Sequence, residues 1–445
     1  MKKGSLRRAA ALLLSCLLCV SSLFVLSSCF RFSEPAEDDV GASEPYIVDV
    51  YTDATGNVRV KYSDGRETTV GGVSQNDYNI TVEGELGDVR AASAKGLLSS
   101  VTVTASFTKT TNGGYGGFFP GMGSGSYQNT YSSKGSGVIY SLDSEQGDAF
   151  IVTNYHVVYD ASSDSGISDN IKVFPYGAQY DSQAIDATYV GGSLFYDIAV
   201  LRVEDCARLR GSVYSAVDVN DVEAVVGQNA IAVGNAEGMG ISTSYGIVSV
   251  ASEYISMTAA DNSGTVTFRV IRVDTAVNSG NSGGGLFNDR GELIGIVNAK
   301  IVDDGVENIG YAIPASVAAA VTDNIIDNCY GKENKSVLRA ILGVNLGITD
   351  SYADVDKETG MPVVVESVSI SAIESGSLAD GRLKVGDVLV SAKLGDRSVT
   401  ITRQYHVIDM MLHARVGDTV SVTVLRDGAT VTVEILVTED GIVRY

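Results

Sequence analysis

The run Asn278-Ser279-Gly280-Asn281-Ser282-Gly283-Gly284 is the most informative stretch of this chain. It places one serine hydroxyl among glycines and small polar residues, ahead of an apolar, strand-like stretch at 292–297. A serine hydroxyl attacks a carbonyl when a base takes its proton and backbone N–H groups stabilise the oxyanion that forms. Glycines leave the backbone accessible for that second task. The run therefore predicts a nucleophile at Ser282, although such a run by itself is equally typical of a tight turn.

A base and an orienting acid can be sought in the rest of the chain, which has only three histidines. His156 follows an apolar, strand-like stretch at 150–152 and a short polar turn, and Asp197 stands directly before the apolar run 198–201. Taken singly, such residues are more often a structural histidine and a solvated strand end. In the order His, Asp, Ser, their three contexts together predict a catalytic triad of His156, Asp197 and Ser282.

Further motifs surround the three triad residues in a fixed order. They are Gly135-Ser136-Gly137-Val138-Ile139, Thr153-Asn154-Tyr155-His156-Val157, Asp197-Ile198-Ala199-Val200-Leu201, Ala232-Val233-Gly234-Asn235, Gly246-Ile247-Val248-Ser249, Gly291-Glu292-Leu293-Ile294-Gly295-Ile296 and Ile309-Gly310-Tyr311-Ala312-Ile313-Pro314. With them the chain resembles the HtrA (DegP-like) family of trypsin-like serine proteases. The resemblance implies a mainly β fold, a chymotrypsin-like double antiparallel β-barrel followed by an α+β PDZ domain. One departure is Gly285, because the family usually has a proline there.

The resemblance also implies site positions. The N–H groups of Gly280 and Ser282 would form the oxyanion hole, and Ala276, six residues before the nucleophile, would lie at the floor of the primary substrate pocket. The pocket walls would include Ala299, Ile301, Ile309, Tyr311 and Ile313. Because no acidic residue occupies the floor position, we expect cleavage after small or medium aliphatic residues rather than after Lys or Arg.

The N-terminus has the layout of a secretory signal. Four basic residues lie within the first eight, and an apolar segment follows from Ala9 to Leu26. The next residues, Leu26-Ser27-Ser28-Cys29, resemble a bacterial lipobox, which implies a signal peptide at 1–28 and a lipidated Cys29. The alternatives are an uncleaved membrane anchor and a simple signal peptide with an incidental cysteine. All three place the rest of the chain outside the cytoplasm, on the bacterial cell membrane in the lipoprotein case.

Composition excludes several classes of function. The formal net charge is −22 at pH 7, which argues against nucleic acid as a partner. The sequence has no EF-hand pattern, zinc pattern or disulfide framework, so we expect no metal and no organic cofactor. After the leader and Cys29, the rest of the chain contains two cysteines, Cys206 and Cys329. Whether these two form a disulfide is left open. Cys329 continues an apolar helical stripe, which favours burial.

The domain organisation is expected as follows. An acidic tether at 29–43 leads to a small β-rich unit at 44–90, whose role cannot be deduced from its residues. A trypsin-like protease domain spans 91–330, and a linker at 331–335 leads to a PDZ domain at 336–441. Within the protease domain, 110–133 combines glycines with aromatic residues. In the family a loop there regulates the active site or mediates assembly, and the alternative is a disordered insertion.

The expected PDZ domain would bind C-terminal or extended peptides by adding a strand to an open sheet edge. Leu342, Gly343 and Val344 would supply its carboxylate-binding N–H groups. His406 and His413 belong to an amphipathic helical pattern and are expected to face this groove or solvent, without a catalytic role.

The sequence therefore predicts an HtrA-like serine endopeptidase of the cell envelope. It would degrade unfolded or misfolded proteins through an acyl-enzyme, with the PDZ domain capturing substrates or activating peptides. Partners would be unfolded polypeptides, peptide C-termini and the membrane, and the family habit implies a trimer. One alternative is a peptide-binding chaperone or scaffold whose protease site is shut or vestigial. A second alternative is a regulatory protease that cuts one signalling substrate.

Overall fold

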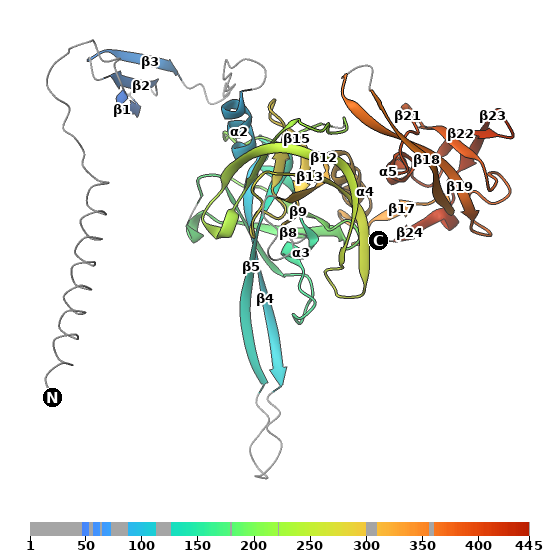
Figure 1. Cartoon of the computed structure of the whole chain (residues 1–445). Coiled ribbons are helices and arrows are strands. Elements are labelled where there is room, and N and C mark those ends of the chain that lie inside the picture. The colour runs from blue at the N-terminus through green and yellow to red at the C-terminus, as the bar shows by residue number, and fades with distance from the viewer. Residues whose placement is uncertain are drawn as a thin grey trace, which may run out of the picture. The chain divides into compact units, whose positions relative to one another are not determined.

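The computed structural model describes residues 47–52, 57–62, 65–72, 88–112, 126–178, 180–220, 222–299, 309–355 and 360–444 (Figure 1). Of the predicted site residues, Cys29 and Ile301 lie outside these ranges. The chain divides into two units, residues 1–74 and 75–445. In the first unit, β1 (Ile47–Thr52), β2 (Asn57–Tyr62) and β3 (Glu67–Gly72) form an antiparallel three-stranded sheet in that order. These strands lie within the range 44–90 expected for the small β unit, and the bounds of that unit stay a prediction.

The second unit begins with helix α2 (Val89–Leu98) and a closed six-stranded barrel in the order β4-β5-β6-β9-β8-β7. Its strands are β4 (Ser100–Asn112), β5 (Ser126–Asp143), β6 (Asp148–Thr153), β7 (Asn170–Pro175), β8 (Ile185–Ser193) and β9 (Ile198–Val203), with α3 (Tyr155–Val158) and η1 (Asp181–Gln183) between them. Apolar residues alternate along β4, where Val101, Val103 and Ala105 are at most 1% exposed. Because the alternation has a period of two residues, one face of each strand points into the barrel interior.

A second barrel follows. Its elements are β10 (Asp218–Val219), β11 (Asn229–Gly234), η2 (Ala236–Gly238), β12 (Ser242–Thr258), β13 (Thr265–Val273), β14 (Gly285–Phe287), β15 (Glu292–Val297) and β16 (Gly310–Pro314). Strand β16 pairs with both β13 and β15 and so closes six of these strands into a ring, while β10 pairs with β15 from outside. Two antiparallel barrels in sequence are the predicted chymotrypsin-like fold.

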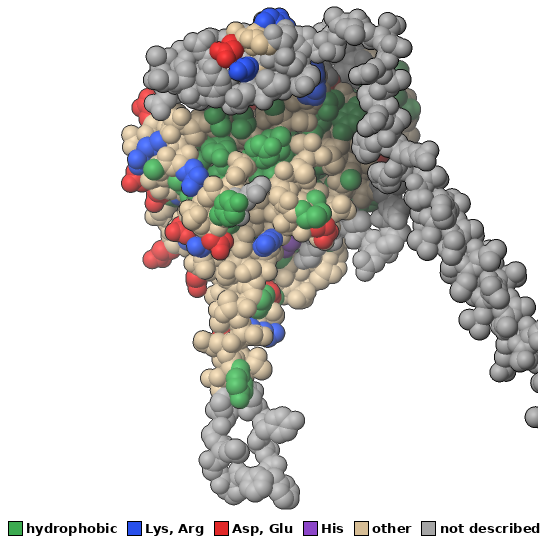
Figure 2. Space-filling model, turned by 90° about the vertical axis from the view of Figure 1, so that its left-hand side faces the viewer, with side chains coloured by type: hydrophobic (Ala, Val, Ile, Leu, Met, Phe, Trp, Pro, Cys, Tyr) green, Lys and Arg blue, Asp and Glu red, His purple; other side chains and the backbone are tan. Residues whose placement is uncertain are grey.

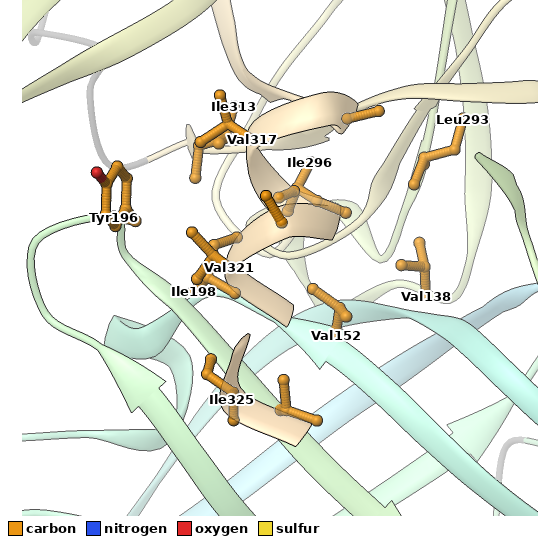
Figure 3. Close-up of a cluster of buried hydrophobic side chains, with 14 of the residues drawn as sticks. Val138, Val152, Tyr196, Ile198, Leu293, Ile296, Ile313, Val317, Val321 and Ile325 are labelled. Carbon is orange, nitrogen blue, oxygen red and sulfur yellow. The ribbon is translucent and has the colours of Figure 1, made fainter. Parts of the chain in front are cut away.

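Helix α4 (Ala315–Cys329) seals the space between the two barrels (Figure 3). Its apolar face, which includes Val317, Val321 and Ile325, packs with Ile198 of the first barrel and Ile296 of the second. Each of these side chains is at most 3% exposed. Cys329 is buried at the end of the same stripe, as predicted, and both Cys206 and Cys329 are free thiols.

The β4–β5 hairpin projects well beyond the first barrel, and Figure 2 shows its surface to be mostly backbone and uncharged polar side chains. The strands pair out to Asn112 and Ser126, so much of the expected loop at 110–133 is regular hairpin. Tyr131 stacks on Phe107 at 5.8 Å between ring centroids, whereas Tyr127 is 73% exposed. Residues 113–125 lie outside the described ranges.

The C-terminal part has an antiparallel sheet in the order β18-β19-β20-β22-β23, with β21 added to β20, and a separate β17–β24 pair. The elements are β17 (Leu338–Ala340), β18 (Val344–Val355), β19 (Pro362–Ile373), β20 (Val388–Leu394), β21 (Arg397–Thr400), α5 (Tyr405–His413), β22 (Thr419–Arg426), β23 (Ala429–Leu436), η4 (Glu439–Gly441) and β24 (Ile442–Arg444). Helix α5 packs into the core of this sheet through Val407, Met410 and Met411. One helix against a six-stranded sheet agrees with the predicted PDZ domain.

A buried arginine links α5 to the second barrel. The side chain of Arg269, on β13, is 2% exposed and reaches Glu223 at 2.7 Å and Asp409 of α5 at 2.5 Å. Its guanidinium also lies 4.2 Å from the centre of the Tyr405 ring. A buried cation held by two carboxylates and a ring face is paired on several sides, as a charge in a low-dielectric site requires.

A search of the described residues for helices long and apolar enough to cross a membrane finds none.

Candidate active site and peptide groove

His156 and Asp197 meet at the edge of the first barrel. His156 Nδ1 lies 2.7 Å from Asp197 Oδ2, and the backbone N–H of His156 donates to Asp197 Oδ1 at 3.0 Å. Since a carboxylate only accepts hydrogen bonds, Nδ1 carries the proton and Nε2 is left as the basic nitrogen. Asp197 has φ of +51°, a left-handed conformation that aspartate tolerates better than most residues. The pair predicted from sequence is therefore assembled.

Two asparagines hold Asp197 in place. Asn298 Nδ2 donates to Asp197 Oδ2 at 2.8 Å, and Asn154 Nδ2 donates to the Asp197 carbonyl at 2.8 Å. Both asparagines are 0% exposed. A buried carboxylate needs such donors because it has lost its water. The contact of Asn298 with Asp197 spans 101 positions of sequence. No local pattern predicts such a contact.

Ser282 lies in the loop between β13 and β14, and it is held against the first barrel by Ser136 of β5. The Ser136 N–H donates to the Ser282 carbonyl at 2.8 Å, and Ser136 Oγ donates to the Gly280 carbonyl at 2.7 Å. Gly135 of β5 separates this loop from α3, since a Cβ on Gly135 would lie 2.6 Å from Val157 and 3.1 Å from the Ser282 carbonyl. The fold thus brings Ser282 into the neighbourhood of His156.

The glycines of the serine loop are required by close approach. Gly280 has φ of +92°, and a Cβ there would lie 2.2 Å from the Asn235 carbonyl oxygen. Gly283 has φ of +84°, and its Cβ would lie 2.2 Å from the Ser136 carbonyl oxygen. No side chain fits at either distance, so glycine at both positions follows from packing as well as from backbone conformation.

The N–H groups of Gly280 and Ser282 lie on either side of Asn281 in the serine loop. Within the described part of the chain, neither the Gly280 N–H nor the Ser282 N–H has a hydrogen-bond partner. The neighbouring groups are engaged, because the Gly280 carbonyl accepts from Ser136 and the Gly283 N–H donates to the Val297 carbonyl at 2.9 Å. Ser282 itself is 6% exposed. Unpaired N–H groups in so buried a place are suited to receive an oxyanion.

The Ser282 hydroxyl is turned toward the chain that follows β15. The Ala299 N–H donates to Ser282 Oγ at 3.2 Å, and among the described residues Oγ has no hydrogen bond with His156. Attack by Oγ on a substrate requires its proton to reach Nε2, so the hydroxyl must rotate toward the imidazole first. Such a bond is often absent until substrate binds.

The predicted pocket is corrected at one position. Ile313 is 0% exposed and packs in the core with Val317 and Ile296, so no substrate side chain can touch it (Figure 3). Strand alternation explains this, because Ile313 points into the barrel interface. Ala276 is exposed, and its carbonyl accepts a hydrogen bond from Ser244 Oγ at 2.8 Å. Ala299, Ile309 and Tyr311 are half-buried and remain candidate wall residues.

Gly285, where the resembling family has proline, opens β14. A Cβ at this position would lie 2.4 Å from the ring of Phe287, which is 0% exposed. The space beside residue 285 is therefore filled by the Phe287 side chain.

A groove of about 680 Å³ lies between β18 and α5. Its walls include Leu346, Ile373, Val407 and Met411, and the segment Leu342, Gly343 and Val344 also lines it. The Leu342 carbonyl accepts a hydrogen bond from the Ala379 N–H, and the Gly343 carbonyl accepts one from the Glu374 N–H. In the described structure, the N–H groups of Leu342 and Gly343 themselves have no partner. Unpaired N–H groups that line a groove between a strand and a helix suit a terminal carboxylate.

The remaining histidines do not line the groove, which was one of the two places expected for them, the other being solvent. His406 and His413 are half-buried, and neither is among the residues that line the groove. The groove side of α5 carries Gln404, Val407, Ile408 and Met411 instead. Burial lowers the pKa of His413 to about 4 and also lowers that of His406, so both rings are neutral at pH 7.

Comparison with known proteins agrees with this geometry. Residues 135–296 match the trypsin-like peptidase domain family, and residues 341–437 match the PDZ domain family. Serine protease Do-like HtrA of Lactococcus lactis subsp. cremoris (strain MG1363) is 31% identical over 368 residues, covering 78% of this chain and 82% of the relative. Its namesake in Bacillus subtilis (strain 168) is 31% identical over 324 residues, covering 71% and 66%.

Periplasmic serine endoprotease DegP of Escherichia coli (strain K12) is 32% identical over 326 residues, covering 73% of this chain and 60% of the relative. A solved structure, HtrA-type protease AlgW with decapeptide, matches 78% of this chain and 98% of that chain at 23% identity and a TM-score of 0.48. The chain belongs to the HtrA family of serine proteases, with a trypsin-like peptidase domain followed by a PDZ domain, and it is a serine-type endopeptidase.

Proposed function

We propose that Ser282, His156 and Asp197 form the catalytic triad of an envelope endopeptidase that degrades unfolded or misfolded proteins. The observation that carries the proposal is the pair of unpartnered N–H groups, on Gly280 and Ser282, beside a hydroxyl in the neighbourhood of the His156–Asp197 pair. An oxyanion hole next to an oriented imidazole is the arrangement that acyl transfer requires.

The mechanism follows from these positions. His156 Nε2 takes the proton of Ser282 Oγ as the oxygen attacks the scissile carbonyl, and the N–H groups of Gly280 and Ser282 receive the oxyanion. Asp197 stabilises the imidazolium through its 2.7 Å contact with Nδ1. The imidazolium then protonates the leaving amine, and a water molecule activated by His156 hydrolyses the acyl-enzyme.

The setting of this activity rests on other features. The leader and Cys29 support a lipoprotein tethered outside the cytoplasm, and the periplasmic relative agrees with an extracytoplasmic location. The groove with its unpaired Leu342 and Gly343 N–H groups supports capture of apolar peptide C-termini. Assembly as a trimer rests on the family alone. Labelling with a radioactive fatty acid, lost in Cys29→Ser, tests the lipid anchor.

Turnover of unfolded casein tests the catalytic proposal. The parent protein should cut casein, and Ser282→Ala should lose roughly a millionfold in rate. Mass-spectrometric mapping of the cut sites should find mainly small or medium aliphatic residues before the scissile bond, because Ala276 offers no counter-charge for Lys or Arg. Equal cleavage by parent and Ser282→Ala would refute the assigned nucleophile, and efficient cleavage after Lys would refute the assigned pocket.

A second candidate is a protein whose site rests shut and opens on a peptide signal. The contact of Ser282 Oγ with the Ala299 N–H favours it, because the hydroxyl is not bonded to its base. Labelling of Ser282 by a fluorophosphonate separates the two. Fast labelling of the free protein indicates a constitutively open site, whereas labelling that accelerates only with a groove-binding peptide indicates the shut state.

A further inference from the structure

Strand β18 extends far beyond the peptide groove. The groove uses only its first residues, Val344 to Leu346, whereas the strand continues to Val355. It is the terminal strand of its sheet, pairing with β19 on one side, and no other described strand pairs with its outer edge. Residues 348–355 are all exposed. The groove is therefore continuous with eight further residues of open strand edge.

This outer part of β18 carries two carboxylates on one face. The register pairs Asp350 with Ser367 and Asp354 with Val363 without a break. Since every second residue of a strand points to the same face, Asp350, Tyr352 and Asp354 lie on one side of the sheet. Each carboxylate accepts one local hydrogen bond, from the N–H of the next residue. Neither forms an ion pair with any Lys or Arg that the structure describes. Their charge is available to a partner.

We propose that a polypeptide bound by its C-terminus in the groove continues along the outer edge of β18, and that Asp350 and Asp354 recognise Lys or Arg side chains upstream in it. The proposal rests on the proposed binding of peptide C-termini by the groove. Antiparallel strands pair residue against residue, so a chain anchored at Gly343 places basic residues about six to ten positions before its terminus beside these carboxylates.

The charge of the edge selects this occupant over a second copy of the chain. Two copies of β18 paired edge to edge would bring their own aspartates together, and like charges facing each other across a strand pair are destabilising. Charged residues on an exposed edge are a common protection against such self-pairing. A basic, extended chain meets the same edge with opposite charge and with Ile348, Tyr352 and Val355 exposed for apolar contact.

Fluorescence anisotropy with synthetic peptides tests the proposal on the full-length protein carrying Ser282→Ala, which prevents cleavage of the probe. One probe is a short peptide of about five residues with an apolar C-terminus. Three longer probes share that terminus and carry lysine, serine or glutamate at the two positions about six and ten residues upstream. The test variant combines Asp350→Asn with Asp354→Asn. The matched control is Asp396→Asn, an exposed aspartate on the β20–β21 turn.

We expect the lysine peptide to bind about three- to tenfold more tightly than the serine peptide at low salt, as two exposed ion pairs allow. The double variant should abolish this difference without changing the dissociation constant of the short peptide, and Asp396→Asn should leave the difference intact.

Equal affinities of the lysine and serine peptides, with the short peptide still bound, would overturn the extended edge and leave the groove proposal standing. Failure of every peptide to bind would overturn the groove proposal and the extension together. Affinity for the long peptides that falls as protein concentration rises, with no lysine preference, would show a second copy on the edge and would also overturn the inference.

Discussion

Gly280→Ala should abolish most of the activity while leaving the protein folded. A Cβ at this position would lie 2.2 Å from the Asn235 carbonyl oxygen and 3.1 Å from the Glu237 N–H, so the backbone must move. Movement takes the Gly280 N–H out of the oxyanion hole. Loss of one oxyanion donor costs about 2.7–4 kcal/mol of transition-state stabilisation, which corresponds to roughly a hundred- to thousandfold loss in kcat.

Gly177→Ala is the matched control for this substitution. Gly177 has φ of +87°, close to the +92° of Gly280, but a Cβ there meets nothing within 4 Å. Both variants therefore carry the strain of a left-handed alanine, about 1–2 kcal/mol, and only Gly280→Ala carries the clash. Steady-state kinetics on casein, with thermal melts of both variants, separate the two effects. If Gly280→Ala kept more than about a third of the parent kcat, the Gly280 N–H would not serve the oxyanion hole.

Three further substitutions test other contacts. Asn298→Leu removes a hydrogen-bond donor from the buried Asp197 carboxylate. The loss should cost about 1.5–3 kcal/mol, divided between transition-state stabilisation, measured as kcat/KM, and the free energy of unfolding. The control, Asn324→Leu, removes an equally buried amide from α4 and should lower only the free energy of unfolding. Burial raises the pKa of Asp409 to about 6, against the opposing effect of Arg269. Since the ordinary value is 3.8, folding takes up a proton between about pH 4 and 6, and the stability that Asp409 contributes is lost as pH rises. The unfolding free energy of the parent minus that of Asp409→Asn should thus fall by about 3 kcal/mol from pH 4 to 7 in urea titrations, and a rise would contradict the assignment. Gly343→Val, whose Cβ would lie 2.2 Å from the Ser377 Cβ, should weaken binding of a C-terminal peptide in anisotropy assays by more than about tenfold without affecting fluorophosphonate labelling of the free protein.

The β-strands and helices were readable from sequence wherever one face of an element is buried. The apolar helical stripe that Cys329 continues belongs to α4 (Ala315–Cys329), and the amphipathic helical pattern around His406 and His413 is α5 (Tyr405–His413). Apolar periodicity carries this signal because burial repeats with the period of the element. The expectation of a loop at 110–133 was partly wrong, because β4 and β5 extend into this range as a projecting hairpin. The hairpin consists largely of polar residues, so burial imposes little pattern on its sequence.

Catalytic candidates were also readable from sequence, because acyl transfer demands particular residue types and each sits in its own local backbone setting. The bond between His156 and Asp197 follows from two short motifs that the first barrel brings together. The serine loop likewise contains its own glycines, and packing explains why glycine is required at positions 280 and 283.

Only the tertiary structure decided which distant residues support that chemistry. Asn298 on Asp197, Ser136 on the serine loop and Asp409 on Arg269 are contacts across 101, 144 and 140 positions. Only the tertiary structure, too, placed Ile313 in the core instead of the pocket and left the outer edge of β18 open. The physical reason is that local sequence sets backbone conformation and periodicity, whereas partners across barrels are set by how whole elements pack.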